Sequence, residues 1–325
     1  MAIVGLGGIG RTHARWYAAN PDAELVAVCD QLSERADPVA EQYGVPAYKS
    51  VDDLLTNEEI DAVSVATAGP ENGGHHFEPT MRLIEAGKHV LVEKPISNDI
   101  GEARQMVRSA EEHGTLLGVD LNHRFTPAAD RAKALQNEGR LGDVLFVNMA
   151  LWINNPNESS PWFHLRALHP HSIDVMRFFA GPIVKVQAFL HKGPGRSIWS
   201  NASINVQFAS GAVGHLTGSY DASRYHPIER CEVAGSAGRF VIDDVFQRLE
   251  FLPRDSPDKL VVDNPIMGGM DGFGQTFGNR IDAFVHQVIA GGPLDASGAD
   301  GLAAQEVIEA AIRSFEGGTV EEVAG

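Results

Sequence analysis

Ala-Ile-Val-Gly-Leu-Gly-Gly-Ile-Gly, residues 2–10, is the stretch of this sequence that decides the fold. A short apolar strand runs into a G-x-G-x-x-G turn, and residues 11–19 then have helical character. In such a turn the first glycine permits a tight bend, the second lets the backbone approach a pyrophosphate, and the third lets the helix pack against the strand. The phosphate lies at the helix amino end. The residues predicted to contact a dinucleotide here are Gly5, Gly7, Gly8, Ile9 and Gly10.

A second apolar run, residues 25–29, ends in an acidic residue, Asp30, which lies 20 residues after Gly10. That spacing is expected of a carboxylate that hydrogen-bonds the ribose 2′-hydroxyl of a dinucleotide. The same carboxylate would repel a 2′-phosphate, and Gln31 adds no arginine to reverse this. Asp30 therefore favours NAD over NADP as the cofactor. The alternative is a solvated acid at the end of a strand.

Strands and helices alternate through the first 121 residues. This alternation implies right-handed crossovers and an α/β fold with a doubly wound parallel sheet. Ser33 is expected to cap the first of the helices that follow Asp30. After the first strand and helix, the expected strands are 25–30, 47–48, 60–67, 89–92 and 116–121, and the expected helices are 33–43, 51–55, 77–86 and 100–113.

Three polar residues, Thr67, Glu93 and Asn122, fall where strands of this predicted sheet end. Ligands bind such sheets outside the carboxyl ends of the strands. Lys94 follows Glu93, and Pro95 restricts the backbone after it. An ammonium group at such a turn must be solvated, paired with an acid, or in contact with a ligand. Because Lys94 follows a strand's carboxyl end, we expect it at the mouth of the dinucleotide site.

One further histidine of the first 121 residues, His76, follows a glycine pair at a helix start. His76 is a candidate to line the phosphate or nicotinamide region of the cofactor site. Polar contacts at the helix start are the equally weighted alternative.

The pattern changes after residue 121. The later segments are β-branched and alternating, which predicts a second α/β domain with a large open, mostly antiparallel sheet. We therefore expect an NAD(P)-binding domain over 1–121 and a substrate-binding and oligomerisation domain over 122–325, with the last helices as candidates to pack back on the first domain. The expected strands are 144–152, 183–191, 200–208, 212–220, 229–234, 240–245 and 248–251, the expected helices are 127–138, 170–179, 279–290 and 301–315, and the expected flexible loop is 267–272.

Composition limits the class of protein and its partners. The chain has 325 residues and a hydrophobic content of 43%, enough for two domains with sizeable cores. The net charge of −17 argues against binding to nucleic acid or to an anionic membrane. No apolar run is long enough to span a bilayer, and no signal segment is recognised. For the two cysteines, Cys29 and Cys231, a disulfide is possible but a reduced pair is favoured, which predicts a cytoplasmic protein.

A second group of polar residues lies near residues 162–174, where three histidines and an arginine surround a predicted helix start at Pro170. His171 and Asp174 are at i and i+3, so they share a helix face. A histidine near a carboxylate can shuttle protons. A metal shared by His169 and His171 is disfavoured because residues two apart point in different directions on a helix. The remaining alternative is an amphipathic helix whose histidines are structural, with their hydrogen bonds satisfied within the fold. We favour this alternative for His164 and His169.

These features together resemble the Gfo/Idh/MocA family of glucose-fructose oxidoreductases and inositol dehydrogenases. The resemblance extends over nearly the whole chain, and the Glu-Lys-Pro segment is its most specific part. The matching segments are the glycine turn at 5–10, Asp30, His76, residues 85–95, residues 122–125, residues 139–142, His171 with Asp174, and residues 282–284.

The resemblance implies a Rossmann domain followed by an α/β domain whose sheet often builds dimers or tetramers. It implies hydride transfer between a nicotinamide cofactor and a secondary hydroxyl of a sugar, cyclitol or related polyol. Lys94 would contact the reacting hydroxyl, and His171 would act as the acid/base. We expect no catalytic metal. The residues expected at the substrate are Asn122, Arg124, Trp162, Arg166, His171 and Asp174.

One position departs from the family pattern. Many members have an aspartate four residues before the catalytic histidine, whereas this chain has Ala167 there. Asp174 or Arg166 could rearrange the site, and Arg166 or Arg224 could favour an anionic substrate. A non-catalytic regulator that senses NAD or a sugar with the same fold is the alternative function.

Overall fold

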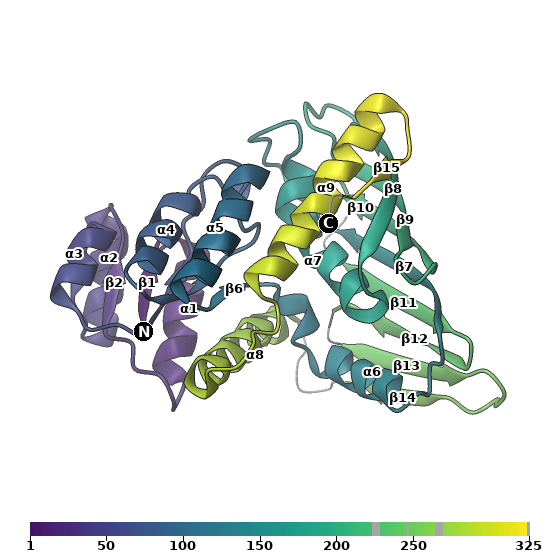
Figure 1. Ribbon diagram of the computed structural model, residues 1–325, viewed down its shortest axis with the longest axis horizontal. Helices are drawn as coiled ribbons and strands as arrows, with labels where there is room; N and C mark the ends of the chain where they lie inside the picture. The colour runs from purple at the N-terminus through teal and green to yellow at the C-terminus, as the bar shows by residue number, and fades with distance from the viewer. Residues whose placement is uncertain (223–227, 246, 264–268, 324–325) are drawn as a thin grey trace. The chain divides into compact units, whose positions relative to one another are not determined.

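A computed structural model describes residues 1–325 except 223–227, 246, 264–268 and 324–325 (Figure 1). The chain divides into two compact units. The first contains residues 1–121 and 277–302, and the second contains residues 122–276 and 303–325. Among the described residues, no helix combines the length and the apolar character that a bilayer-spanning helix needs.

The first unit is built on a parallel sheet of six strands in the order β3-β2-β1-β4-β5-β6. This is the strand order of a doubly wound dinucleotide-binding fold, as the sequence predicted. The elements are β1 (Ala2–Val4), α1 (Gly8–Ala19), β2 (Ala27–Cys29), α2 (Ser33–Tyr43), β3 (Ala47–Tyr48), α3 (Val51–Asn57), β4 (Ala62–Val65), η1 (Pro70–Asn72), α4 (Phe77–Glu85), β5 (His89–Val92), α5 (Ile100–His113) and β6 (Leu117–Val119).

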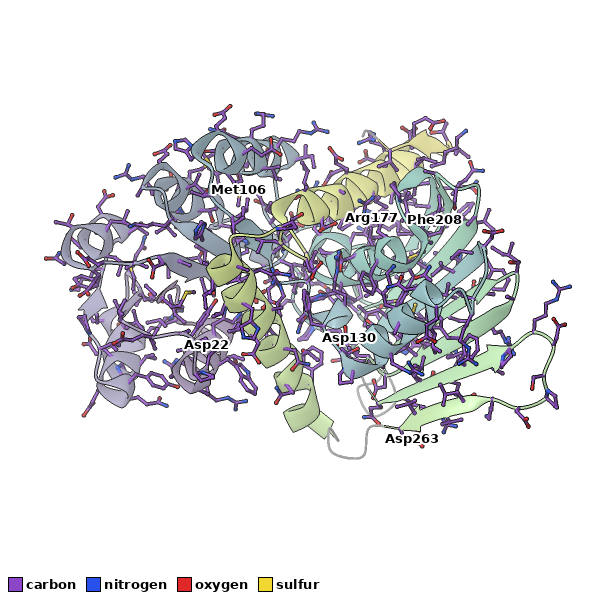
Figure 2. The ribbon with its side chains drawn as sticks, turned by 60° about the horizontal axis from the view of Figure 1, so that its bottom comes forward. Asp22, Met106, Asp130, Arg177, Phe208 and Asp263 are labelled. Atoms are coloured by element: carbon purple, nitrogen blue, oxygen red, sulfur yellow. The ribbon has the colours of Figure 1, made fainter. Side chains whose placement is uncertain are left out.

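The central strands of this sheet are buried, as their continuous apolar runs require. Every residue of β1, β2 and β4 is buried. The helices cover the sheet through side chains such as Tyr17 of α1 and Met106 of α5, both fully buried. Met106 is labelled in Figure 2. The sheet is therefore a rigid base for the loops at its carboxyl edge.

The second unit contains a mixed sheet of nine strands in the order β14-β13-β12-β11-β7-β10-β9-β8-β15. Its pairs are antiparallel except for β7 with β10, which confirms the predicted mostly antiparallel sheet. Its elements are η2 (Asn122–Arg124), α6 (Pro127–Asn137), β7 (Val144–Trp152), α7 (Phe163–Ala180), β8 (Ile183–His191), β9 (Asn201–Phe208), β10 (Val213–Ser219), β11 (Glu229–Gly235), β12 (Gly238–Asp243), β13 (Arg248–Pro253), β14 (Leu260–Asp263) and β15 (Glu321–Glu322). Of the three boundaries between the units, one follows residue 121 and the other two fall inside the remaining helices, α8 (Gly269–Ala290) and α9 (Gly298–Gly317).

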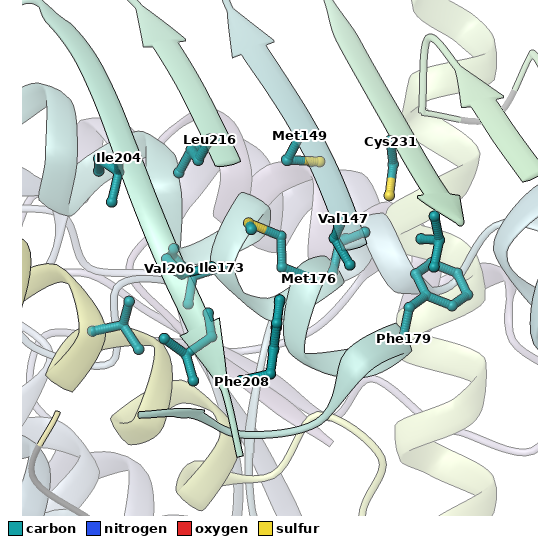
Figure 3. Close-up of a cluster of buried hydrophobic side chains, with 14 of the residues drawn as sticks. Val147, Met149, Ile173, Met176, Phe179, Ile204, Val206, Phe208, Leu216 and Cys231 are labelled. Carbon is teal, nitrogen blue, oxygen red and sulfur yellow. The ribbon is translucent and has the colours of Figure 1, made fainter. Parts of the chain in front are cut away.

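One face of the nine-stranded sheet packs on helices and forms the core of the second unit. Alternate side chains of β7, β9 and β10 point to this face, and Met176 and Phe179 of α7 meet them (Figure 3). This alternation of buried and open positions is the period-two pattern that identified the strands in the sequence.

Several predicted boundaries were wrong. The helix expected from Pro170 begins at Phe163, so Pro170 lies inside it. Gly269 already belongs to α8, so the predicted loop at 267–272 is helical from 269 onward, and 267–268 lie outside the described residues. Ser33 is the first residue of α2 and makes no capping hydrogen bond. Strands β14 and β15 were not predicted.

Candidate functional site

The glycine-rich turn joins β1 to α1 with very little space at two of its glycines. Gly5 has φ of +91°, and a Cβ there would lie 2.7 Å from the Thr67 backbone nitrogen. A Cβ on Gly10 would lie 1.8 Å from the Gly5 carbonyl oxygen. A Cβ on Gly7 or Gly8 would meet no atom within 4 Å. The first and third glycines therefore serve packing, and the middle of the turn leaves its backbone accessible to a ligand.

The start of α1 has the features of an anion site. Gly7 caps this 12-residue helix and makes no side-chain capping hydrogen bond, and the first turn carries no acidic residue. The amide groups and the dipole of such a helix end favour a phosphate. A dinucleotide pyrophosphate fits this turn.

Asp30 lies beside the turn and is fixed by it. One carboxylate oxygen accepts a hydrogen bond from the Leu6 amide at 2.8 Å, and the other accepts from the Leu32 amide at 2.9 Å. Only 9% of the residue is exposed. The structure thus places a carboxylate next to the glycine-rich turn, where the sequence spacing predicted one.

The Glu-Lys-Pro turn follows β5 and is held by groups from neighbouring loops. The Lys94 amide donates to the Glu93 carboxylate at 3.2 Å, and the Lys94–Pro95 peptide is cis. His76 is fully buried and its Nδ1 donates to the Pro95 carbonyl oxygen at 2.8 Å. Burial lowers the pKa of His76 to about 4, so its ring is neutral. His76 therefore acts directly on the turn that carries Lys94.

The side chain of Lys94 is half-buried, and its amino group is poorly solvated. Burial lowers the pKa of this amine, while the charges of Glu93 and Asp120 act in the opposite direction. A lysine with a lowered pKa exchanges protons near neutrality more readily than a solvated one. Lys94 therefore has the electrostatic surroundings of an acid/base group.

A buried cluster lies directly behind this turn. His13 Nε2 donates to Glu93 at 3.2 Å and to Asp120 at 3.1 Å, and His13 Nδ1 contacts the Ser64 hydroxyl at 3.1 Å. Burial alone would lower the pKa of His13, but the hydrogen bonds and charges of Asp120 and Glu93 raise it to about 9. The cluster is compact enough to hold a cation. A protonated His13 already supplies a positive charge between the two carboxylates, so a metal ion would have to displace its proton in order to bind there.

In the second unit His171 stacks on another histidine. Its ring lies 4.0 Å from the ring of His123, with an interplanar angle of 9°. His123 Nδ1 donates to the buried carboxylate of Glu229 at 2.6 Å. His171 therefore belongs to a row of two imidazoles that ends in a carboxylate.

The other predicted substrate residues divide into separate groups. Arg124 donates through two nitrogens to Asp174, in a buried pair beside η2 and α7. Asn122 donates to the Thr276 hydroxyl at 2.6 Å. The remaining two are farther along the unit: Arg166 donates to Glu309 at 2.7 and 2.9 Å, and Trp162 stacks near Trp199.

The other two histidines of α7 form a buried pair. His164 and His169 approach at 3.1 Å between their Nε2 atoms, and burial lowers the pKa of His164 to about 3. Burial also lowers the pKa of His169, so both rings are neutral and pack in the interior of the unit. Cys29 and Cys231 are free and buried, and Arg224 lies outside the described residues.

Sequence reasoning missed five residues of these groups: His13, Asp120, His123, Glu229 and Glu309. A signal existed for Asp120, since it follows β6 at the same carboxyl edge as Glu93. His123 lies between two residues that were assigned roles. Glu229 and Glu309 gave no signal, because their partners are 106 and 143 residues away.

Two family descriptions match the chain. Residues 1–121 match the Gfo/Idh/MocA family described as an oxidoreductase family with an NAD-binding Rossmann fold, and residues 129–241 match the carboxyl-terminal domain of the same family.

Named relatives cover nearly the full length. Inositol 2-dehydrogenase of Rhizobium meliloti is 28% identical, with 96% of this chain and 95% of the relative aligned. Myo-inositol 2-dehydrogenase of Thermotoga maritima is 26% identical, with 97% and 96% aligned. The structure of levoglucosan dehydrogenase with NADH and levoglucosan has the same fold, with a TM-score of 0.89 and 23% identity over 100% of this chain and 99% of that one.

Proposed function

We propose, since the chain belongs to the Gfo/Idh/MocA oxidoreductase family, that it is an NAD-dependent dehydrogenase that oxidises a secondary hydroxyl of a sugar, cyclitol or related polyol. The observation that carries this proposal is Lys94: a poorly solvated amine with a lowered pKa, on a turn at the carboxyl edge of a dinucleotide-binding sheet. The relatives named for inositol and levoglucosan oxidation support the substrate class.

The first unit would hold the cofactor. The open backbone at Gly7 and Gly8 and the amino end of α1 fit a pyrophosphate, and Asp30 fits a ribose hydroxyl. We favour NAD over NADP because the Asp30 carboxylate would repel a 2′-phosphate. When bound, NAD supplies the hydride acceptor. The residues proposed to form its site, directly or through the turns they hold, are Gly5, Gly7, Gly8, Ile9, Gly10, Asp30, Thr67, His76, Glu93 and Lys94.

Lys94 of the first unit and His171 of the second unit would take part in transfer of the proton from the hydroxyl. Lys94 is kept from full solvation by burial, which favours its neutral form and a hydrogen bond to the hydroxyl. His171 would accept the proton, because an imidazole is a common general base and this one is buried. Asn122, Arg124, Trp162, Arg166 and Asp174 would shape the substrate region.

We assign nucleotide binding to residues 1–121 and substrate binding to residues 122–325. The free, buried cysteines are compatible with a reducing compartment, and we propose a cytoplasmic protein.

The test is Lys94→Ala, assayed by absorbance at 340 nm while NAD is screened against a panel of polyols. Turnover should fall about 10²-fold or more, because the group that assists proton transfer is lost. NAD affinity, measured by calorimetry, should stay close to that of the wild type. Lys49→Ala, which removes an exposed lysine of the same unit, is the matched control and should leave both values unchanged.

Two results would contradict the proposal. Unchanged turnover in Lys94→Ala would remove the role of Lys94. Tight NAD binding by the wild type without reduction across the whole panel would instead favour a regulator that senses NAD or a sugar.

A further inference from the structure

We propose that His13 is a positioning residue for Lys94: it holds the Glu93 carboxylate in the place where this carboxylate anchors the turn that carries Lys94. The proposal deepens the proposed function, on which the role of Lys94 in proton transfer rests. It depends on residues 1–121 alone, which all belong to the first unit.

Glu93 connects the interior of the first unit with this turn. Its backbone amide donates to the Val65 carbonyl oxygen at 2.9 Å, which fixes its main chain at the end of β5. Its side chain makes one contact through each carboxylate oxygen: Oε2 accepts from the Lys94 amide at 3.2 Å, and Oε1 lies 3.2 Å from His13 Nε2. Because both oxygens belong to one planar group, a rotation that breaks the contact with His13 also disturbs the contact with Lys94.

The ring of His13 is a firm support for this carboxylate, because buried groups of other elements hold it. Nδ1 lies 3.1 Å from the Ser64 hydroxyl of β4, which in turn lies 2.9 Å from the Tyr17 hydroxyl. Nε2 lies 3.1 Å from the carboxylate of Asp120, which follows β6. None of these four residues is more than 1% exposed. A buried hydrogen-bonded network of this kind makes its members rigid.

The charge of His13 gives the Glu93 carboxylate a reason to stay in the interior. Two neighbouring buried carboxylates are costly unless a cation or a strong donor faces them. Burial opposes the charged form of His13, but the hydrogen bonds and charges of Asp120 and Glu93 outweigh it and raise its pKa to about 9. At neutral pH the imidazolium therefore faces both carboxylates.

Without His13, Glu93 is the carboxylate that should move. The side chain of Glu93 is 10% exposed and that of Asp120 is not exposed at all, so only Glu93 has a path toward water. A Glu93 side chain that moves outward, or that takes up a proton, is a weaker acceptor for the Lys94 amide. The backbone of Lys94 would then lose the contact that fixes its direction. A displacement of about 1 Å in a catalytic group can cost about 10²-fold in rate.

The test is hydrogen exchange at the Lys94 amide, followed by NMR of protein labelled at the lysine amides. The Lys94 signal is assigned by its loss in Lys94→Arg. His13→Gln keeps a neutral donor, whereas His13→Leu removes both donor and charge. Exchange at Lys94 should become about tenfold faster in His13→Gln, as expected when a hydrogen bond to a charged group is weakened, and faster still in His13→Leu. His13→Gln is the milder change and remains informative if His13→Leu fails to fold.

Two controls separate this role from a general loss of stability. Lys88 is observed in the same spectra, and its amide donates to the Leu83 carbonyl oxygen at 2.9 Å, away from His13. Its exchange should stay at the wild-type rate. Tyr17→Phe removes the hydroxyl that contacts Ser64 and leaves the contacts of His13 with the carboxylates in place. It should lower Tm without changing exchange at Lys94. Equal acceleration at Lys94 and Lys88 in the His13 variants would show a purely structural role and overturn the proposal.

The exchange measurement does not depend on activity, so the two proposals can fail separately. If the wild type oxidises a polyol, kcat should fall about tenfold or more in both His13 variants, while the Kd for NAD stays close to that of the wild type. Faster exchange at Lys94 with unchanged kcat would overturn the link between His13 and catalysis. If no polyol is oxidised, the proposed function fails, and the exchange still decides whether His13 holds the turn. Wild-type exchange at Lys94 in the His13 variants would overturn the inference.

Discussion

At the scale of single residues, His13 joins two buried carboxylates behind the turn that carries Lys94. Its Nε2 donates to Glu93 and Asp120, and its pKa of about 9 means that it carries a charge at neutral pH. The contribution of this arrangement to the free energy of unfolding depends on pH. The folded pKa lies above the unfolded value of 6.5, so the stabilisation is present below pH 6.5 and is lost as the pH rises through 9.

Asp120→Asn tests this arrangement. Removing one carboxylate should lower the pKa of His13, reduce the free energy of unfolding at pH 6.5 by up to about 3 kcal/mol, and flatten its decline toward pH 9. Urea unfolding across that pH range provides the measurement. Asp22→Asn removes an exposed carboxylate that contacts His286 and is the control, because exposed pairs contribute little. Identical pH curves for wild type and Asp120→Asn would refute the role.

The same residues show what a sequence can predict. Gly5, Gly10 and Asp30 were identified because their spacing along the chain is itself the signal. The contact between His13 and Asp120 joins residues 107 positions apart. It depends on the order of strands β1, β4, β5 and β6 in the sheet, which the local sequence pattern does not specify. Lys94 was identified from its place at a strand end, whereas its lowered pKa depends on burial that only the folded unit defines.

At the scale of elements, the turn between β1 and α1 uses its glycines in two different ways. No larger residue fits at Gly10, because an added Cβ would overlap the Gly5 carbonyl oxygen. Gly7 has φ of −66°, which any residue adopts, and its Cβ would meet open space. Within one motif, Gly10 is therefore needed for stability, whereas Gly7 is needed for cofactor binding.

The variants Gly10→Ala and Gly7→Ala should therefore behave oppositely. Gly10→Ala should destabilise the first unit by about 3 kcal/mol, because the helix must move away from the strand. Gly7→Ala should keep its stability within about 0.5 kcal/mol of the wild type. It should nevertheless weaken NAD binding about tenfold or more, because the methyl group occupies the space that a pyrophosphate would approach. Thermal unfolding and calorimetric titration measure the two effects, and wild-type NAD affinity in Gly7→Ala would contradict the proposed cofactor site.

Helix α7 shows where element prediction fails. The sequence His-Pro-His favoured a helix start at Pro170, since proline suits the first turn. The observed helix begins seven residues earlier, and most of its residues are buried. A helix buried on nearly all sides is held by tertiary packing, which outweighs the local cost of an internal proline. Burial of this kind arises from the whole unit and leaves no boundary signal in the local sequence.

At the scale of the whole molecule, the nine-stranded sheet leaves large apolar side chains exposed. Phe189 of β8 is 61% exposed and Val213 of β10 is 54% exposed. Both lie on the same face: Val213 pairs with Gln207, Gln207 pairs with Lys185, and Phe189 lies four residues along β8 from Lys185. The helices of the unit pack on the other face, through the core side chains. Exposed apolar residues on an open sheet face are typical of an interaction surface.

This face should carry the homodimer or homotetramer interface expected from the sequence. Light scattering coupled to size exclusion should give the wild type a mass of two or four chains of 35.0 kDa. The double variant Phe189→Glu with Val213→Glu should give a mass of one chain, because a glutamate at each position would have to lose its hydration in the interface. Ile289→Glu replaces an apolar residue on α8 that is 66% exposed, and it should leave the mass of the assembly unchanged. A wild type that elutes as a single chain, or a double variant that keeps the wild-type mass, would exclude this face as the interface. If Ile289→Glu alone reduced the mass, the interface would instead involve α8.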